Sequence, residues 1–552
     1  MAGPLGTMYI AGSGLRAMQN SVNAAANNIA NAQTEGYSRR RVNLVTNTPQ
    51  YLQGIGEVNT GVRIDSVIRV RDGFLDKQVR AERATFGLFE ARGEALDQLE
   101  MIFREPSTTG LNTVMNEMWD SWQELSKAPE SSTSRTVVVQ QAITMTDMFN
   151  HMGNQIDDVR GNLQAGINQT AFDANTLIQQ IRDVDNQIIN VKIKEIIPND
   201  LLDQRDLLLD KLSDLVDIRT QDQADGGISL RVSGREVMGK TNEDLVMSTI
   251  QSVTDDGGGQ FTLTILEEGA AGKTPKTVVL ENVNPEKAAL LKQGGTFFHD
   301  RIEGNERTID LSAETEVALA VPKSGRITGQ QEMLAEMDVY ENELNTLARG
   351  IGEIINLVHR AGNDTVDTDA GWINFFTAGD GDPDADNPMT AKNIRVNQEI
   401  QHDVFKINGG EGDLTNEGPA GDGTRALAIA QLRNFRFDVN NPVIGNEGDQ
   451  NAIVYQDGSM GLKYTGVGGD STDNFYRNSI GRLGISAQQA DRMVQNQESL
   501  LNQLNQRKEA VSGVSIDEEI ADLIKFQNGY QANARVMTTL TLMLDTLINL
   551  GR

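Results

Sequence analysis

Apolar residues recur at helical spacing at both ends of this chain, and no other feature limits its fold so strongly. Residues 15–29 place a mostly apolar side chain at every third or fourth position, and residues 520–548 keep the same spacing near the other end. A helix with such a stripe buries it against a partner helix. The sequence therefore predicts terminal helices that pack against one another or against other copies of the chain.

Two arrangements satisfy these stripes: an intramolecular coiled coil that closes the chain, or packing between subunits. Between Gly529 and Leu550 only Arg535 and Asp545 are charged. The outer face of a two-stranded coiled coil is usually charged, so this composition favours a last helix that is surrounded on several sides, as in a tube. The predicted assembly interface comprises Leu15, Met18, Val22, Ile29, Leu523, Tyr530, Met537, Leu540, Leu544 and Leu547.

The balance of charges excludes several classes of partner. Lys and Arg number 49 against 78 Asp and Glu, which gives a net charge of −29. Proteins that bind nucleic acid need a basic surface, and anionic lipid headgroups would be repelled.

No apolar run reaches the roughly 20 residues of a membrane span, so no membrane insertion is expected. The absence of cysteine excludes disulfide scaffolds, thiolate zinc sites and cysteine nucleophiles.

At roughly 100–200 residues per domain, a chain of 552 residues is expected to form three to five domains, and changes in periodicity indicate their boundaries. The pattern predicts an α+β multidomain fold in which the N- and C-terminal helices pair as a coiled coil. Further helices form a long α-helical rod, and two β-rich domains are inserted into it. The predicted domains are residues 1–60 with 512–552 (terminal coiled coil), 61–221 with 326–361 and 476–511 (rod), 222–325 (first β-rich insert) and 362–475 (second β-rich insert).

Local patterns predict particular elements inside these domains. Ile228, Leu230 and Val232 alternate with polar residues, as in a half-buried strand. Short strands are also predicted at Ile394–Val396 and Val404–Ile407 in the second insert.

Capping sequences predict where the last helices begin. Ser486 with Gln489, and Ser515 with Glu518, fit the capping box that opens a helix. Ser512-Gly513 is therefore expected to be a hinge between two helices.

No catalytic constellation is apparent, so we expect neither an enzyme nor a bound cofactor. The histidines, His151, His299, His359 and His402, are far apart and form no metal-binding motif. Asp380, Asp382 and Asp384 alternate as calcium ligands can, but Ala385 and Ala391 occupy the positions where an EF-hand loop needs Gly and Glu. A solvated acidic turn is the favoured interpretation. Arg39, Arg40 and Arg41 form a basic cluster whose expected partners are carboxylates, in the same chain or in a neighbouring subunit.

Several motifs resemble the bacterial flagellar rod, hook and hook-associated proteins. Ala26-Asn27-Asn28-Ile29-Ala30-Asn31, followed by Thr34-Glu35-Gly36-Tyr37-Ser38-Arg39, is similar to the N-terminal signature of that family, with Glu35 in place of its usual Pro. The segment from Ser512 to Leu550 is similar to its C-terminal signature. Three internal stretches, the segments 199–206, 356–376 and 484–511, narrow the resemblance to the hook–filament junction members.

The resemblance implies a structural adaptor between hook and filament. Such proteins form a homo-oligomeric ring whose terminal helices line an inner tube, while the β-rich domains face outward. It implies hook protein, hook-associated protein 3 and a cytoplasmic export chaperone on the C-terminal helix as partners. It also implies an extracellular location, reached through the flagellar type III export apparatus without a cleaved signal peptide. Alternatives are another axial protein, such as hook-associated protein 3 or a hook protein, and an adhesin or enzyme domain carried on an axial scaffold.

Overall fold

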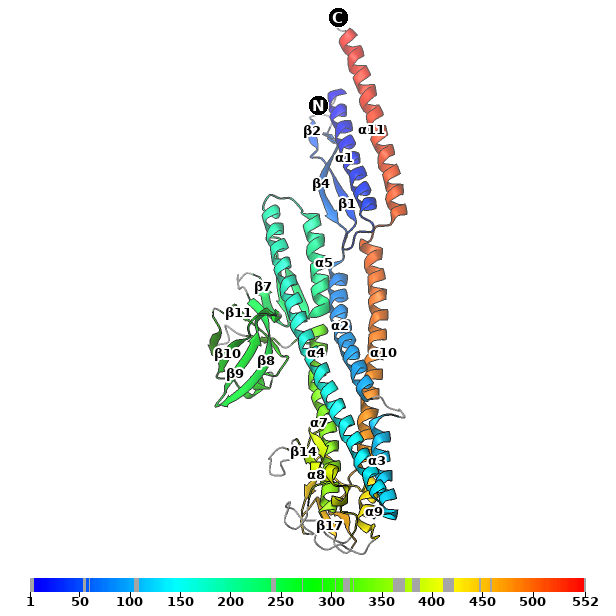
Figure 1. Ribbon diagram of the computed structural model, residues 1–552. Coiled ribbons are helices and arrows are strands. Elements are labelled where there is room, and N and C mark those ends of the chain that lie inside the picture. The colour runs from blue at the N-terminus through cyan, green and yellow to red at the C-terminus, as the bar shows by residue number, and fades with distance from the viewer. Residues whose placement is uncertain are drawn as a thin grey trace. The chain divides into compact units, whose positions relative to one another are not determined.

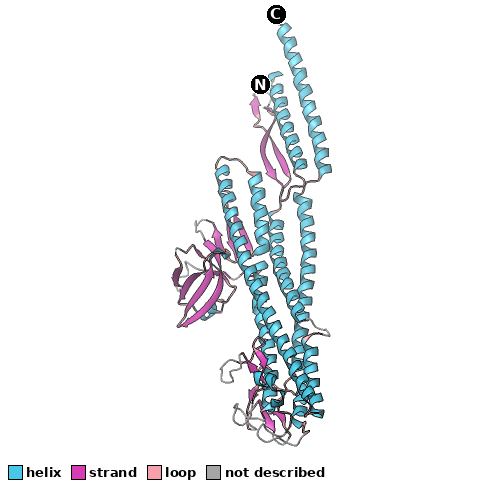
Figure 2. Ribbon diagram, in the orientation of Figure 1, coloured by secondary structure: helices cyan, strands magenta, loops and turns pink. Residues whose placement is uncertain are grey.

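A computed structural model shows an α+β protein in which long helices dominate (Figure 2). It describes residues 4–52, 56–58, 60–103, 109–239, 245–270, 272–289, 291–302, 304–310, 318–320, 322–360, 373–379, 388–410, 421–445, 448–456 and 459–550. The chain divides into two compact units. Unit 1 comprises Met1–Phe89, Ile167–Thr328 and Met493–Arg552, and unit 2 comprises Glu90–Gly166 and Gly329–Arg492.

The first and last helices of the chain are neighbours in unit 1. Helix α1 spans Pro4–Ala30 and helix α11 spans Ile516–Leu550. They lie side by side and run in opposite directions, and the end of α11 extends past the start of α1 (Figure 1). The prediction of a helix at each terminus is thus confirmed, and the structure gives each helix a partner within the same chain. We call α1 and α11 the terminal helix pair.

A β-hairpin follows α1 and packs against it. Strand β1 (Arg40–Thr46) pairs antiparallel with β4 (Val62–Arg69), and both strands contact α1. The backbone N–H of Val62 donates to Ser13 Oγ of α1 at 3.2 Å. A second short pair joins β2 and β3, which span Gln50–Leu52 and Gly56–Val58.

Long helices form the body of both units. Residues of both units belong to the long helices α2 (Gly73–Phe103), α4 (Ser132–Lys192), α7 (Arg326–His359) and α10 (Thr472–Ser512). Helix α3 (Leu111–Lys127) lies in unit 2, and helix α5 (Asn199–Leu215) lies in unit 1. Their apolar faces are buried, as the sequence pattern predicted.

The junction between the last two helices lies where the sequence predicted a hinge. Helix α10 ends at Ser512, and the following Gly513 lies so close to the preceding turn that a Cβ atom there would be 2.4 Å from the carbonyl oxygen of Glu509. The helix start predicted at Ser486 is wrong, because Ser486 lies inside α10. Leu483 and Ala490, on either side of it, are both buried, so packing continues the helix through a sequence that could have capped one.

Two sheets occupy residues 218–320 of unit 1. Three strands, β5 (Ile218–Asp222), β6 (Ile228–Val232) and β7 (Arg235–Met238), form one sheet. The other has the order β12-β10-β9-β8-β11-β13, with β8 at Leu245–Gly257, β9 at Gln260–Leu266, β10 at Lys276–Glu281, β11 at Thr296–Asp300, β12 at Glu306–Asp310 and β13 at Ala318–Ala320. Leu263, Ile265 and Phe297 are fully buried between its strands and the segments that cover them. The alternating residues predicted as strands are therefore strands.

The described residues between 373 and 464 mix short helices with small sheets, where the sequence pattern indicated mainly strands. They contain strands β14 (Phe376–Ala378), β15 (Ile394–Val396), β16 (Val443–Ile444), β17 (Ala452–Gln456) and β18 (Gly461–Tyr464), and helices α8 (Gln398–His402), η2 (Val404–Lys406), α9 (Thr424–Gln431) and η3 (Leu432–Asn434). The strand predicted at Ile394–Val396 is confirmed. The strand predicted at Val404–Ile407 is wrong, because Asp403 accepts a hydrogen bond from the Phe405 N–H at 3.0 Å and caps a 3₁₀ turn there.

Gly325 precedes α7 in a conformation that only glycine tolerates well. Its φ is +98°, and a Cβ atom there would lie 2.5 Å from the carbonyl oxygen of Leu215. We expect Gly325→Ala to lower the free energy of unfolding of unit 1 by at least about 2 kcal/mol, because backbone atoms cannot move aside easily. Urea unfolding followed by circular dichroism measures this. Gly73→Ala is the matched control, because no atom lies within 4 Å of its added Cβ; equal midpoints for the two variants would contradict the prediction.

Candidate assembly site

Small residues let the terminal helix pair approach closely. A Cβ atom on Gly14 would lie 2.7 Å from Asn533 Oδ1, and one on Gly529 would lie 2.9 Å from Met18 Sδ. These contacts fix an antiparallel register in which residue numbers rise on α1 as they fall on α11. Two glycines at the contact allow backbones to approach but supply little buried area, so the pairing alone gains limited hydrophobic stabilisation.

The predicted interface residues lie on the terminal helix pair but are incompletely covered there. Leu15, Met18, Val22, Ile29, Leu523, Met537, Leu540 and Leu544 are half-buried. Tyr530 and Leu547 remain 40% and 56% exposed. Leu15 and Tyr530 line one open groove together with Gly12 and Arg16. The structure thus brings these residues to one helix pair without burying them.

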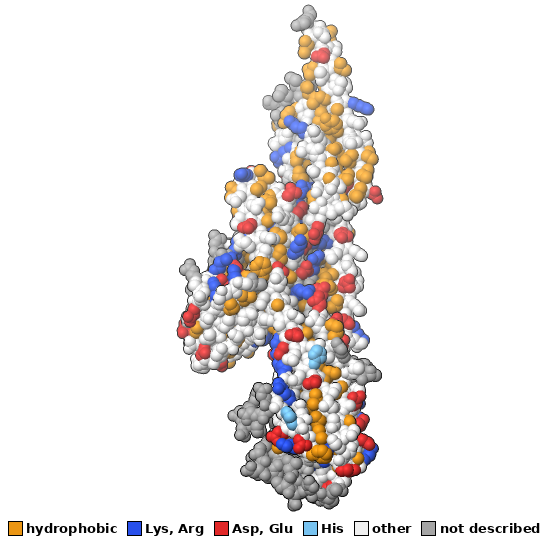
Figure 3. Space-filling view, viewed as in Figure 1, with side chains coloured by type: hydrophobic (Ala, Val, Ile, Leu, Met, Phe, Trp, Pro, Cys, Tyr) orange, Lys and Arg blue, Asp and Glu red, His pale blue; other side chains and the backbone are white. Residues whose placement is uncertain are grey.

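Helix α11 carries further large apolar side chains on its exposed faces. Hydrophobic side chains gather along α11 in the space-filling view (Figure 3). The exposed ones include Ile516, Ile520, Ile524, Val536, Leu542, Met543, Ile548 and Leu550. Large apolar side chains exposed in this number on one helix are typical of a surface that contacts another protein.

Arg39 ties the start of α11 to the segment after α1. Its guanidinium contacts Glu519 Oε1 at 2.6 Å and Glu518 Oε2 at 3.0 Å, and its backbone N–H donates to the Ser512 carbonyl at 3.0 Å. The Glu519 side chain is only 4% exposed, so this is a largely desolvated pair and not a surface one. The prediction that the basic cluster pairs with carboxylates is confirmed for Arg39, and the carboxylates belong to the same chain.

Arg40 points to the opposite side and pairs with α5. Its guanidinium forms ion pairs with Asp200 and, at 3.9 Å, with Asp203. Successive side chains of an extended segment alternate, which explains why adjacent arginines reach different helices. Arg41 is exposed and pairs with none of the residues that the structure describes.

Asn28, from the N-terminal motif, joins three parts of unit 1 through one buried amide. Its Nδ2 donates to Glu519 Oε2 at 3.0 Å and to the Arg40 carbonyl at 2.9 Å. Its Oδ1 accepts from the Arg40 N–H at 2.9 Å and the Tyr37 hydroxyl at 3.0 Å. The side chain is 1% exposed and uses both donors and both acceptor sites. The motif residue therefore fixes the end of α1 against α11 and β1.

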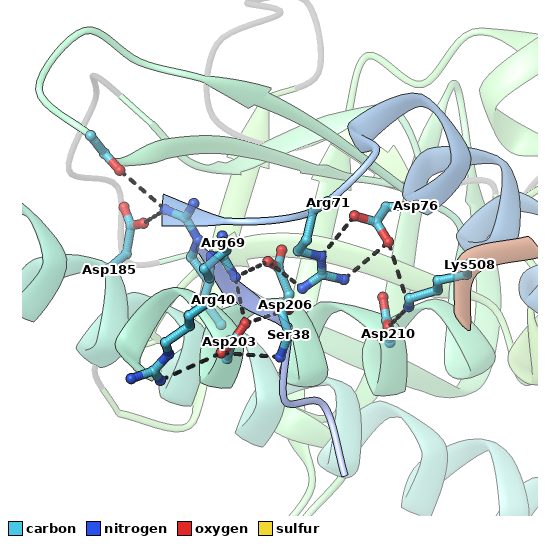
Figure 4. A network of polar contacts seen from close by, with 12 residues as sticks. Ser38, Arg40, Arg69, Arg71, Asp76, Asp185, Asp203, Asp206, Asp210 and Lys508 are labelled. Carbon is cyan, nitrogen blue, oxygen red and sulfur yellow. Dashed lines mark hydrogen bonds and ion pairs between the residues drawn. The ribbon is translucent and has the colours of Figure 1, made fainter. Parts of the chain in front are cut away.

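A buried network of arginines and aspartates holds the β-hairpin to the helices of unit 1 (Figure 4). Asp206 of α5 accepts from Arg69 at 2.8 Å, from Arg71 at 2.7 Å and from Arg80 at 3.1 Å. Around it the network includes Ser38–Asp203, Arg69–Asp203, Arg71–Asp76, Arg80–Asp210 and Lys508–Asp210. We call this set the arginine–aspartate joint. It links β4, α2, α5 and α10 at the point where the chain passes to the terminal helix pair.

Asp206 and Asp210 of the joint are held in the ionised form near neutral pH by the cations around them. Burial raises the pKa of Asp206, but Arg71, Arg80 and Arg69 lower it further, to about 2 from 3.8. Burial opposes ionisation of Asp210 as well, and Arg80 and Lys508 still bring its pKa below the ordinary value. Opposite charges in contact thus outweigh the cost of desolvation at both carboxylates.

The spacing of the aspartates in the sequence is a signal for this joint. Asp203, Asp206 and Asp210 keep the three- and four-residue spacing of one helix face, and two of them lie in or beside the stretch that carried a family resemblance. Arg69 and Arg71 sit two residues apart, the spacing of one face of an extended segment. Three aspartates on one face of a helix indicate basic partners, although they do not say which.

Two of the four histidines are buried in structural hydrogen bonds. His299 is fully buried, and its Nε2 lies 2.7 Å from Ser248 Oγ, which is also fully buried. His359 is 2% exposed, and burial lowers its pKa to about 4. Its Nδ1 lies 3.0 Å from the Ile373 carbonyl, and its Nε2 accepts from the Asn408 N–H at 2.9 Å.

The structure also bears on metal and membrane binding. Over the described ranges, no group of three or more His, Asp or Glu side chains is arranged to hold a metal ion. The calcium candidates Asp380, Asp382 and Asp384 lie outside the described residues. None of the described helices combines the length and the apolar character that a bilayer crossing requires.

Three segments of the chain match known protein families. Residues 96–284 match the family described as flagellar hook-associated protein FlgK helical domain. Residues 509–550 match the flagellar basal body rod FlgEFG protein C-terminal family, and residues 8–37 match the flagella basal body rod protein family. The last two matches cover most of the terminal helix pair.

Proteins of similar length match almost the whole chain. The chain is 29% identical to flagellar hook-associated protein 1 of Bacillus subtilis, over 97% of this chain and 96% of that protein. It is 24% identical to flagellar hook-associated protein 1 of Escherichia coli, over 98% of each. The solved structure of the flagellar hook junction protein FlgK from Burkholderia pseudomallei has the same fold, with a TM-score of 0.53 and 14% identity over 79% of this chain and 100% of that one.

Proposed function

This chain belongs to the flagellar hook-associated protein 1 family and is a structural protein of the flagellar hook–filament junction; we propose that it assembles there through its terminal helix pair. In this proposal each copy packs α1 and α11 against the helix pairs of neighbouring copies. The helix pairs together line an inner tube, and the sheets of residues 218–320 face outward.

One observation carries this proposal: the terminal helix pair is formed within the chain yet keeps large apolar side chains exposed along its length. Leu547 and Leu550, near the end of α11, are 56% and 78% exposed. Burial of such a side chain in an assembly contributes roughly 1.5–3 kcal/mol. Neighbouring helix pairs would supply that burial.

The same exposure supports the proposed partners and route. Hook protein on one side of the ring and hook-associated protein 3 on the other would cover surfaces that a single layer of subunits leaves open. A cytoplasmic chaperone would cover α11 before export, since an apolar helix of this kind promotes aggregation. We propose export through the flagellar type III apparatus, without cleavage of a signal peptide.

The proposal is tested by deleting the gene in its flagellated host. We expect hooks without filaments, and filament protein in the medium, because the filament has no adaptor on which to grow. Electron microscopy of the cells and immunoblots of the medium measure both outcomes. Complementation with the full chain restores filaments. Deletion cells that carry normal filaments would refute the adaptor role.

A further inference from the structure

The turn between α4 and α5 exposes three isoleucines of unit 1. Ile193, Ile196 and Ile197 are 73%, 56% and 44% exposed. The turn has a defined backbone, in which the Glu195 N–H donates to the Lys192 carbonyl at 2.8 Å. We call residues 192–198 the hairpin tip. A turn that only connects two helices has no need of three exposed isoleucines, and such a cluster marks an interaction surface.

The hairpin tip carries two lysines against one carboxylate, Glu195, and so is net basic on a strongly acidic chain. Lys192 and Lys194 are exposed, and neither forms an ion pair with any other residue that the structure describes. Hydrophobic and basic side chains gather at this end of the α4–α5 hairpin (Figure 3). The tip therefore fits an apolar surface that is edged by carboxylates.

The start of α11 offers a surface of that composition. Ile516, Ile520 and Ile524 are 43%, 45% and 53% exposed, and their spacing of four residues places them along one face of the helix. Asp517 and Glu518 are exposed at the same end. We call the three isoleucines the isoleucine stripe.

The hairpin tip and the isoleucine stripe lie at the same level of unit 1 and on opposite sides of it. Asp200, next to the tip, pairs with Arg40, and Glu518, beside the stripe, pairs with Arg39. These arginines are adjacent residues whose side chains point to opposite sides. Figure 1 shows the tip of the α4–α5 hairpin and the start of α11 on opposite sides of strand β1.

From this placement we infer that the hairpin tip of one copy docks on the isoleucine stripe of the neighbouring copy. The inference rests on the proposed function, in which copies stand side by side around the junction. Because the two surfaces differ and lie on opposite sides, the contact is head-to-tail, and repetition around an axis closes a ring. It adds a second set of contacts, at the start of α11, to those between the helix pairs, and the complementary charges of the tip and the stripe select this occupant.

The absence of cysteine from the chain permits a specific crosslinking test. Full-length Ile196→Cys and Ile520→Cys variants are expressed together in the deletion host, and intact hook–filament junctions are isolated and mildly oxidised. We expect a covalent dimer of the two variants. Neither variant alone should give it, because each copy then carries a single cysteine at only one of the two surfaces.

Matched variants test specificity. Thr176→Cys, which is exposed on α4 about 24 Å along the helix from its end, replaces Ile196→Cys as the control and should give no dimer with Ile520→Cys. Adding Lys194→Glu to the tip variant should lower the crosslink yield several-fold. Adding Asp517→Lys to the stripe variant should restore that yield. If Lys194→Glu merely misfolded the tip, this change on the other surface would not restore the crosslink.

The outcomes separate this inference from the proposed function. If the cysteine variants are present in junctions and filaments grow, but no dimer forms or the tip crosslinks to another axial protein, the docking inference fails and the junction role stands. If the chain is absent from isolated junctions, the proposed function fails as well. A dimer that forms equally with Thr176→Cys also overturns the inference.

Discussion

Replacing Asp206 with asparagine should lower the free energy of unfolding of unit 1 by about 3 kcal/mol. Asp206 contacts three guanidinium groups and its side chain is only 15% exposed. Removal of its charge leaves the positively charged side chains of Arg69, Arg71 and Arg80 close together without the carboxylate that they share. Each still has a second carboxylate, in Asp203, Asp76 or Asp210, so the loss stays near the lower end of the range for a broken buried ion pair. Asparagine keeps the shape of the side chain, which isolates the effect of charge.

The two units provide an internal reference for this measurement. Trp119 and Trp122 lie in unit 2, and the third tryptophan falls within the residue range of that unit, so tryptophan fluorescence follows unit 2, whereas far-UV circular dichroism follows both units. We expect Asp206→Asn to shift the dichroism transition in urea and to leave the fluorescence transition in place. Asp214→Asn is the control on the same helix, because Asp214 is 45% exposed in its pair with Arg83, and exposed pairs contribute about 0–1 kcal/mol. Equal shifts for the two variants would refute a central role for Asp206.

Acid unfolding offers a second check on the same residue. The pKa of Asp206 is about 2 in the folded chain, against an ordinary value of 3.8. The unfolded state therefore binds more protons between these values, and stability falls as the pH is lowered through them. The charged Asp206 contributes about 2 kcal/mol above this window. In Asp206→Asn this part of the acid dependence should disappear.

The elements that could be predicted from sequence are those whose burial repeats with a fixed period. The stripes at residues 15–29 and 520–548 predicted α1 and α11, and the alternation at residues 228–232 predicted β6. Burial of one face of a helix or strand makes apolar residues recur at a fixed spacing, and this spacing does not depend on which element covers that face. The same reasoning could not predict Val404–Lys406, because a single capping side chain decides the conformation of so short a segment.

The partners in the arginine–aspartate joint could not be predicted for a different reason. Arg69 and Asp206 are far apart in the sequence, and the chain has 78 acidic residues that could pair with any arginine. Helical spacing shows that Asp203, Asp206 and Asp210 share a face, but only the tertiary fold selects which basic residues meet that face. The sequence thus predicted the kind of partner for Arg39 and Arg40 correctly and left the identity of each carboxylate open.

The terminal helices themselves supply the second prediction of large effect. In Val22→Asp combined with Leu544→Asp, we expect the fraction of cells with filaments to fall at least about tenfold. Both side chains are half-buried on the terminal helix pair, and a carboxylate there must be desolvated without a partner when neighbouring helices pack around it. The penalty recurs at every copy in the junction, so a modest cost per subunit becomes a large one for the assembly. Electron microscopy of complemented deletion cells measures the fraction.

Two controls separate assembly from export and folding. Val22→Ala combined with Leu544→Met keeps both positions apolar and should still support filaments. The charged variant should appear in the culture medium, which shows that it was exported but not retained, and its tryptophan fluorescence transition should match that of the unaltered chain, because the tryptophans lie in unit 2. Normal junctions built from the charged variant would mean that the terminal helices do not hold the subunits together, and the proposed mechanism of assembly would have to be abandoned.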